Sequence, residues 1–113
     1  GRIGDSPIPG AGSYVNSKIG GAAATGDGDV LMRFMPSYQA VEFLSQGLSP
    51  NQAASMALKR IIEFEKYFSG AIVVLSKSGE HGASSFGFDN FSYYYASDII
   101  QSPILISVTP MST

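Results

Sequence analysis

The sequence contains no cysteine and no tryptophan among its 113 residues, and only 14% of these residues are charged. The lack of cysteine excludes disulfides and thiolate metal sites within this chain. Charged residues make up about 25% of an average soluble domain, so a chain this poor in charge is expected to be covered in part by other protein. The longest aliphatic run, residues 71–75, falls far short of the roughly 20 apolar residues that cross a bilayer.

Basic residues are also few, and they are scattered. Seven Lys and Arg stand against nine Asp and Glu, for a formal net charge of −2. Nucleic-acid binding needs a concentrated basic face, so this class of partner is not expected. The single histidine, His81, has no companion Cys or Asp at catalytic spacing, and we expect it in a turn or on the surface. Asn90-Phe91-Ser92 matches an N-glycosylation sequon, which has meaning only in a secreted protein.

The first half of the chain predicts a loop, a strand and two or three helices. Residues 1–20 are rich in Gly, Pro and Ser and exclude a regular helix, while the small residues 21–25 favour a strand that ends in a turn. The apolar spacing over 29–46 is helical, interrupted by Pro36 and followed by Gly47 as a C-cap. Ser49-Pro50 is typical of a helix start. We expect that helix to continue to about Phe68, with its buried stripe formed by Ala53, Met56, Ala57, Ile61, Phe64 and Phe68.

After Gly70 the pattern changes to that of strands. Residues 71–76, 80–86 and 91–96 are the expected strands, and the tyrosines 93–95 indicate a strand with both faces covered. The tail, residues 98–113, has no clear period and is expected to be irregular. No linker divides the chain, so residues 1–113 are interpreted as a single, partial domain of the α+β class.

Two charged residues in the first loop suggest a site for an amino acid. Arg2 and Asp5 lie three residues apart. A guanidinium binds a carboxylate through two parallel hydrogen bonds, and a nearby carboxylate can hold an ammonium group. The pair could therefore bind both ends of a free α-amino acid, although an Arg–Asp pair in a loop is more often a surface salt bridge.

Thr25 and Gly26 are expected at a junction between a strand and a helix. The first N–H groups of a helix lack partners within the helix, and a threonine hydroxyl beside such an N–H can form an oxyanion hole. The simpler alternative is that the two residues provide only turn geometry and helix capping. Together with Arg2 and Asp5 they compose half of an amidase site, without a nucleophile and its base.

Two stretches carry a resemblance to a known family. GRIGDSPIPGAGSYV and GGAAATGDGDVLMRFMPSYQAVEFL closely resemble glycosylasparaginase (aspartylglucosaminidase), an N-terminal-nucleophile hydrolase. The resemblance covers residues 1 to about 86 and fades in the tail. The wider family, which includes plant-type asparaginases with isoaspartyl peptidase activity, shares the GR-x-GDSP and ATG runs, and residues 31–40 resemble the glycosylasparaginase branch in particular.

The resemblance implies a four-layer αββα sandwich and a self-cleaving precursor. A threonine freed at the start of the second subunit attacks the side-chain amide of glycosylated asparagine, with its own amino group as base and without a metal or organic cofactor. The matching Arg2 would bind the substrate α-carboxylate, and Asp5 the α-amino group. Thr25 and Gly26 would form the oxyanion hole.

The sequence departs from the family pattern in its extent. The family nucleophile lies before the GRIGDSP run, so we expect the chain to correspond to the C-terminal part of the nucleophile-bearing subunit. The expected partner is the remainder of the enzyme, in an (αβ)₂ assembly, with a lysosomal or secretory location if the protein is like the animal members. An asparaginase or β-aspartyl peptidase, and an inactive truncated product, remain the alternatives.

Overall fold

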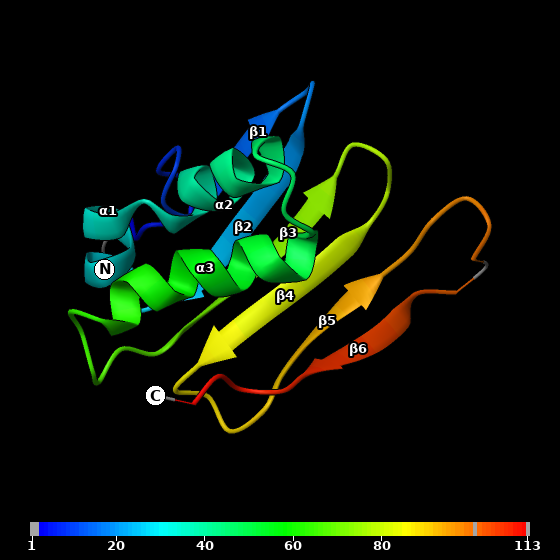
Figure 1. The fold of residues 1–113 in the computed structure, drawn as a ribbon. Coiled ribbons are helices and arrows are strands. Elements are labelled where there is room, and N and C mark those ends of the chain that lie inside the picture. The colour runs from blue at the N-terminus through cyan, green and yellow to red at the C-terminus, as the bar shows by residue number, and fades with distance from the viewer. Residues whose placement is uncertain (1–2, 101, 113) are drawn as a thin grey trace.

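The computed structural model describes residues 3–100 and 102–112, which form a mixed α+β fold with three helices and two antiparallel sheets. The chain passes from a hairpin through the helices to four further strands (Figure 1). The elements are β1 Ser13–Asn16, β2 Gly20–Gly26, α1 Gly28–Phe34, α2 Pro36–Ser45, α3 Pro50–Ile62, β3 Gly70–Ser76, β4 His81–Phe86, β5 Phe91–Tyr95 and β6 Ile104–Val108. Within the described ranges no helix is both long and apolar enough to cross a membrane.

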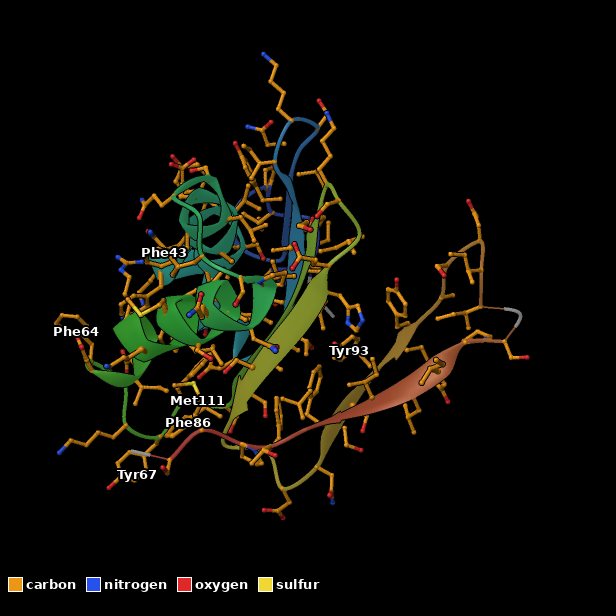
Figure 2. The ribbon with its side chains drawn as sticks, turned by 45° about the vertical axis from the view of Figure 1, so that its right-hand side comes forward. Phe43, Phe64, Tyr67, Phe86, Tyr93 and Met111 are labelled. Carbon is orange, nitrogen blue, oxygen red and sulfur yellow. The ribbon has the colours of Figure 1, made fainter. Side chains whose placement is uncertain are left out.

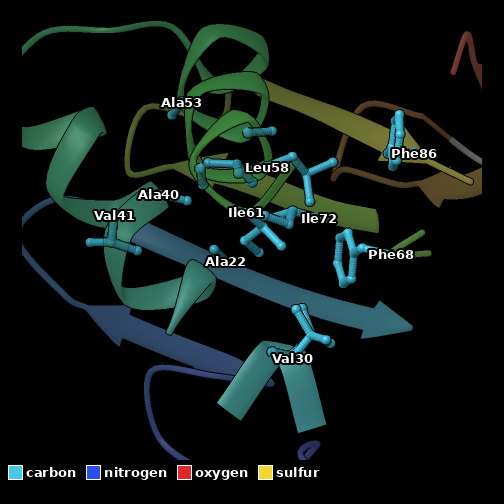
Figure 3. Packing of buried hydrophobic residues seen from close by; sticks show 14 residues of the cluster. Ala22, Val30, Ala40, Val41, Ala53, Leu58, Ile61, Phe68, Ile72 and Phe86 are labelled. Atoms are coloured by element: carbon cyan, nitrogen blue, oxygen red, sulfur yellow. The ribbon is translucent and has the colours of Figure 1, made fainter. Parts of the chain in front are cut away.

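The larger sheet has the order β1-β2-β3-β4, and all three helices lie on one of its faces (Figure 1). Because side chains alternate along a strand, Ile72 and Val74 point toward the helices, where they are buried. Figure 3 shows Leu58 and Ile61 of α3 packed over Ile72 in this core. The core is therefore complete on the helical side of the sheet.

The helix boundaries follow local capping signals. At the start of α3, the Ser49 hydroxyl accepts a bond from the Gln52 N–H at 3.2 Å, and the Gln52 side chain accepts one from the Ser49 N–H, which completes a capping box. After α2, Gly47 adopts a φ of 97°, and the Leu48 N–H bonds back to the Phe43 carbonyl. This is a Schellman ending, which requires a left-handed residue at Gly47. The expected start at Ser49-Pro50 and break at Pro36 are confirmed, whereas the C-cap of α2 is Gln46 and Gly47 is the left-handed residue after it.

The expected end of α3 near Phe68 was wrong, because the helix stops at Ile62. Phe68 is buried, whereas Phe64 is 73% exposed and lies outside the helix, against Phe34. Figure 2 shows Phe64 at the outer end of this region. The chain must turn after α3 to bring Phe68 into the core before β3 begins. Met56 was also misplaced, since the buried side of α3 runs through Ala53, Ala54, Ala57, Leu58 and Ile61.

The tail is not irregular as expected, because Ile104–Val108 forms strand β6. It pairs with β5 in a second, two-stranded sheet, in which Tyr93 lies opposite Ile106 and Tyr94 opposite Leu105. The side of Tyr94 and Leu105 remains exposed, at 71% and 55%. On the other side Phe91, Tyr93 and Tyr95 are half-buried, so the expectation that both faces of this strand are covered is met only in part.

The second sheet lies beyond β4, near the face of the larger sheet that the helices leave uncovered (Figure 1). A cleft of about 370 Å³ separates Val73 and Leu75 on this face from Tyr93–Tyr95 of β5. Figure 2 shows Tyr93 in the space between β4 and the hairpin. The two sheets are thus joined through a few contacts rather than through a filled core.

Candidate functional site at the end of strand β2

Three of the four residues predicted to form a site lie at or near the junction between β2 and α1. Thr25 and Gly26 are the last residues of β2, and α1 begins at Gly28. Asp5 reaches the same junction from the first loop. Arg2 lies outside the described residues, so its predicted partnership with Asp5 stays a prediction.

Gly26 occupies a position that only glycine fits. Its φ is 135°, and a Cβ there would lie 2.2 Å from the Ser69 carbonyl oxygen and 2.6 Å from the Gly70 Cα. The close approach allows β2 to continue its ladder to the last pair, Gly26 opposite Gly70. The backbone at Gly26 is therefore held in one geometry by packing against β3.

The hydrogen-bond pattern indicates where the Gly26 N–H points. Asp27 donates to the Ser69 carbonyl at 2.9 Å, on the β3 side, whereas Ala24 donates to the Gly12 carbonyl at 2.9 Å, on the opposite side. Donors alternate between the two sides along a strand, so the Gly26 N–H is directed to the same side as that of Ala24. This is the side of the first loop, which carries Asp5.

That loop is fixed by bonds to neighbouring elements. The Ser37 hydroxyl donates to the Ala11 carbonyl at 2.7 Å in a buried position, and the Tyr38 N–H donates to the Gly10 carbonyl at 2.9 Å. Gly12 lies so close to Asp5 and Ser6 that a Cβ would be 2.4 Å from the Asp5 carbonyl oxygen. These contacts explain why a Gly- and Pro-rich segment holds a defined shape.

The Asp5 carboxylate is buried against α1. Asp5 is only 8% exposed, and its Oδ1 would be 2.8 Å from a Cβ on Gly28. The other oxygen, Oδ2, is buried and has no hydrogen-bond partner among the described residues. Burying a carboxylate oxygen without a partner is unfavourable, so this atom is suited to a cationic or N–H donor that the described residues do not supply.

Thr25 projects from the uncovered face of the larger sheet. It pairs with Ala71. Because side chains alternate along a strand, Thr25 points to the same face as Ala23, whereas the buried Ala22 points to the other face. Both Thr25 and Gly26 are exposed. Oxyanion donors are most effective where water is excluded, so the predicted oxyanion role would need further protein above the uncovered face.

Sequence reasoning missed Gly28, whose lack of a side chain makes room for Asp5. The Gly26-Asp27-Gly28 run was the available signal, but it indicated only a turn. Groups of three or more His, Asp or Glu suited to a metal are absent from the described part of the chain.

His81 is not the surface or turn residue that we expected. It begins β4 and is half-buried, with its Nδ1 2.7 Å from the Tyr93 hydroxyl and its ring stacked on Tyr95 at 3.9 Å. The register places His81 opposite Leu75, whereas Thr25 lies opposite Ala71, farther along the sheet. His81 therefore connects the two sheets and lies apart from the candidate site.

Comparison with known proteins establishes the family. A family described as asparaginase matches residues 1–102. The chain belongs to this asparaginase family of N-terminal-nucleophile hydrolases. The resemblance noted from the GRIGDSP and ATG runs is thereby confirmed.

The family relatives carry two kinds of name. The chain is 50% identical over 97 residues to a protein of Drosophila yakuba provisionally named an N(4)-(beta-N-acetylglucosaminyl)-L-asparaginase, covering 86% of this chain and 24% of that protein. A Drosophila grimshawi protein with the same provisional name is 50% identical over 93 residues, or 82% and 24% of the two chains. An L-asparaginase-like protein of Drosophila pseudoobscura pseudoobscura is 47% identical over 93 residues, or 82% and 20%. The chain thus spans about a quarter of the length of these relatives.

Proposed function

We propose that this chain supplies part of the substrate site of a glycosylasparaginase-type amidohydrolase, whose threonine nucleophile comes from a segment outside these 113 residues. The observation that carries the proposal is the buried Oδ2 of Asp5 beside the end of β2, which has no hydrogen-bond partner among the described residues. A substrate α-ammonium group would provide the missing donors. Arg2, three residues earlier, would bind the α-carboxylate through its two-pronged guanidinium.

In the proposed reaction, Thr25 and Gly26 stabilise charge on the substrate. The nucleophilic hydroxyl would attack the side-chain amide carbonyl of glycosylated asparagine, and the carbonyl oxygen would become an oxyanion. The Thr25 hydroxyl and the Gly26 N–H would donate to it. Collapse of this intermediate would release the glycosylamine, and water would then hydrolyse the β-aspartyl ester to aspartate.

The proposed architecture is an αββα sandwich to which this chain contributes one helical layer and parts of two sheets. Support comes from the uncovered face of the larger sheet, where Gly21, Ala23 and Ala83 are small and allow another sheet to approach closely. The remainder of the enzyme would fill the cleft between the larger sheet and the tyrosines of β5. An (αβ)₂ assembly is the proposed form.

A second candidate is an asparaginase or β-aspartyl peptidase, favoured by the relative named L-asparaginase-like. Both candidates would use Arg2, Asp5, Thr25 and Gly26, and they differ in whether the pocket admits a sugar. The test is to express the full-length protein that contains this chain and to compare kcat/KM for N-acetylglucosaminyl-asparagine, asparagine and a β-aspartyl dipeptide.

A preference for the glycosylated substrate is the expected result. A higher kcat/KM for the bare substrates would favour the second candidate and leave the roles of Asp5 and Thr25 intact. Turnover of none of the three substrates by a correctly processed protein would contradict both.

A further inference from the structure

The chain contains one N-glycosylation sequon that the proposed hydrolase function does not use. Three asparagines occur, Asn16, Asn51 and Asn90. Only Asn90 is followed two residues later by Ser or Thr, in Asn90-Phe91-Ser92, with a residue other than proline between them.

The fold presents Asn90 where a glycan can be carried. Asn90 is exposed at the end of the connection between β4 and β5, and Ser92 is the exposed second residue of β5. Side chains two apart in an extended chain point to the same side, so the Asn90 amide and the Ser92 hydroxyl share a side, opposite to Phe91. Glycosylation of a sequon requires the transferase to bind the asparagine amide and the serine hydroxyl at the same time.

The neighbouring residues also favour this position. The rings of Phe88 and Phe91 stack with centroids 6.3 Å apart, on either side of Asn90 in the sequence. Phe88 is only partly buried, so its ring can offer an apolar surface to the first sugar. A glycan at Asn90 would extend from a loop, at the opposite end of β5 from the contact between His81 and Tyr95.

We propose that Asn90 is N-glycosylated. The Asn90 amide nitrogen would form a bond to the anomeric carbon of an oligosaccharide carried on a polyprenyl pyrophosphate. The bond from that carbon to the pyrophosphate would break, the polyprenyl pyrophosphate would leave, and the amide would lose one proton. The transfer takes place in the lumen of the secretory pathway, so the proposal also implies that the chain enters that lumen. This implication is the same for both candidate hydrolase functions.

The experiment uses the full-length protein with its natural ends, expressed in insect cells. It is treated with peptide N-glycosidase in heavy-oxygen water, and the peptide with Asn90 is examined by mass spectrometry. We expect conversion of Asn90 to labelled aspartate. Ser92→Ala should abolish the conversion and Ser92→Thr should preserve it. Ser107→Ala is the matched control, because Ser107 pairs with Ser92 across the hairpin, is exposed and belongs to no sequon.

Glycan transfer precedes folding, so the readout does not depend on whether a variant folds. Recovery of the wild-type peptide with unlabelled Asn90 would overturn the proposal. Labelling that persists in Ser92→Ala would overturn it too, since conversion would then arise from chemical deamidation. Neither result bears on the hydrolase proposal, which is tested by turnover.

Discussion

Asp5→Asn in the full-length enzyme is the most direct test of the candidate site. Asparagine keeps the shape of the side chain, so it still fits against Gly28, where Asp5 Oδ1 leaves only 2.8 Å to a Cβ. It removes the negative charge and converts one buried oxygen to an N–H₂ group. If Oδ2 accepts from the substrate α-ammonium, the variant loses that bond and gains a repulsive contact.

The structure sets the scale of the effect. Asp5 is 8% exposed, so a bond to its Oδ2 is largely shielded from water. A hydrogen bond to a charged group contributes about 1.5–3 kcal/mol, which corresponds to roughly 10- to 150-fold in kcat/KM at 1.4 kcal/mol for each factor of ten. We expect a loss in this range, mainly through KM.

The assay compares two substrates on wild type and on Asp5→Asn. One is a chromogenic aspartyl amide, and the other is the same amide without its α-amino group. Wild type should prefer the first strongly, and the variant should have lost most of that preference. Equal losses on both substrates, accompanied by a lower melting temperature, would show that Asp5 supports only the loop and would refute the assignment.

Three further predictions concern other parts of the chain. Thr25→Val in the processed enzyme should lower kcat by about 10²- to 10³-fold with a smaller change in KM, as loss of an oxyanion donor does; a lower melting temperature with unchanged kcat would instead make Thr25 a structural residue. Ser49→Ala should lower the free energy of unfolding by about 1 kcal/mol through loss of the capping box, measured by denaturant titration, and should leave kcat unchanged; an unaltered midpoint would contradict the capping role. Burial raises the pKa of the Tyr93 phenol, so the neutral form is favoured in the fold. The associated stability is complete below the ordinary tyrosine pKa of about 10 and is lost as pH rises through the higher folded value. Tyrosine ionisation can be followed by absorbance at alkaline pH in wild type and in Tyr93→Phe. The difference between the two titration curves should show one tyrosine whose pKa lies above the ordinary value, and a pKa at or below that value would contradict this.

Local signals predicted most of the secondary structure. Pro36, Gly47 and Ser49-Pro50 each act within one helical turn, so the helix starts and the first break could be predicted from the sequence. The end of α3 could not, because no Gly or Pro occurs between Pro50 and Gly70. The position of that end is imposed by the need to place Phe68 in the core, which is a tertiary requirement.

The candidate site was predicted only in part, for a related reason. Chemical type and spacing suggested Asp5, Thr25 and Gly26 before any geometry was known. The contact between Asp5 and Gly28 joins residues 23 positions apart in the chain, through a loop whose shape depends on bonds to α2. No local pattern contains this information. His81 was misjudged in the same way, since its partners Tyr93 and Tyr95 belong to another sheet.

The low charge of the chain is explained by where its uncovered surfaces lie. Only 14% of the residues in the chain are charged, and the face of the larger sheet opposite to the helices is apolar, with Val15 and Leu75 73% and 50% exposed. Exposed apolar residues on this face favour further layers of protein over it. The same layers would exclude water from Thr25 and Gly26, so completing the fold and activating the proposed oxyanion hole become one structural requirement.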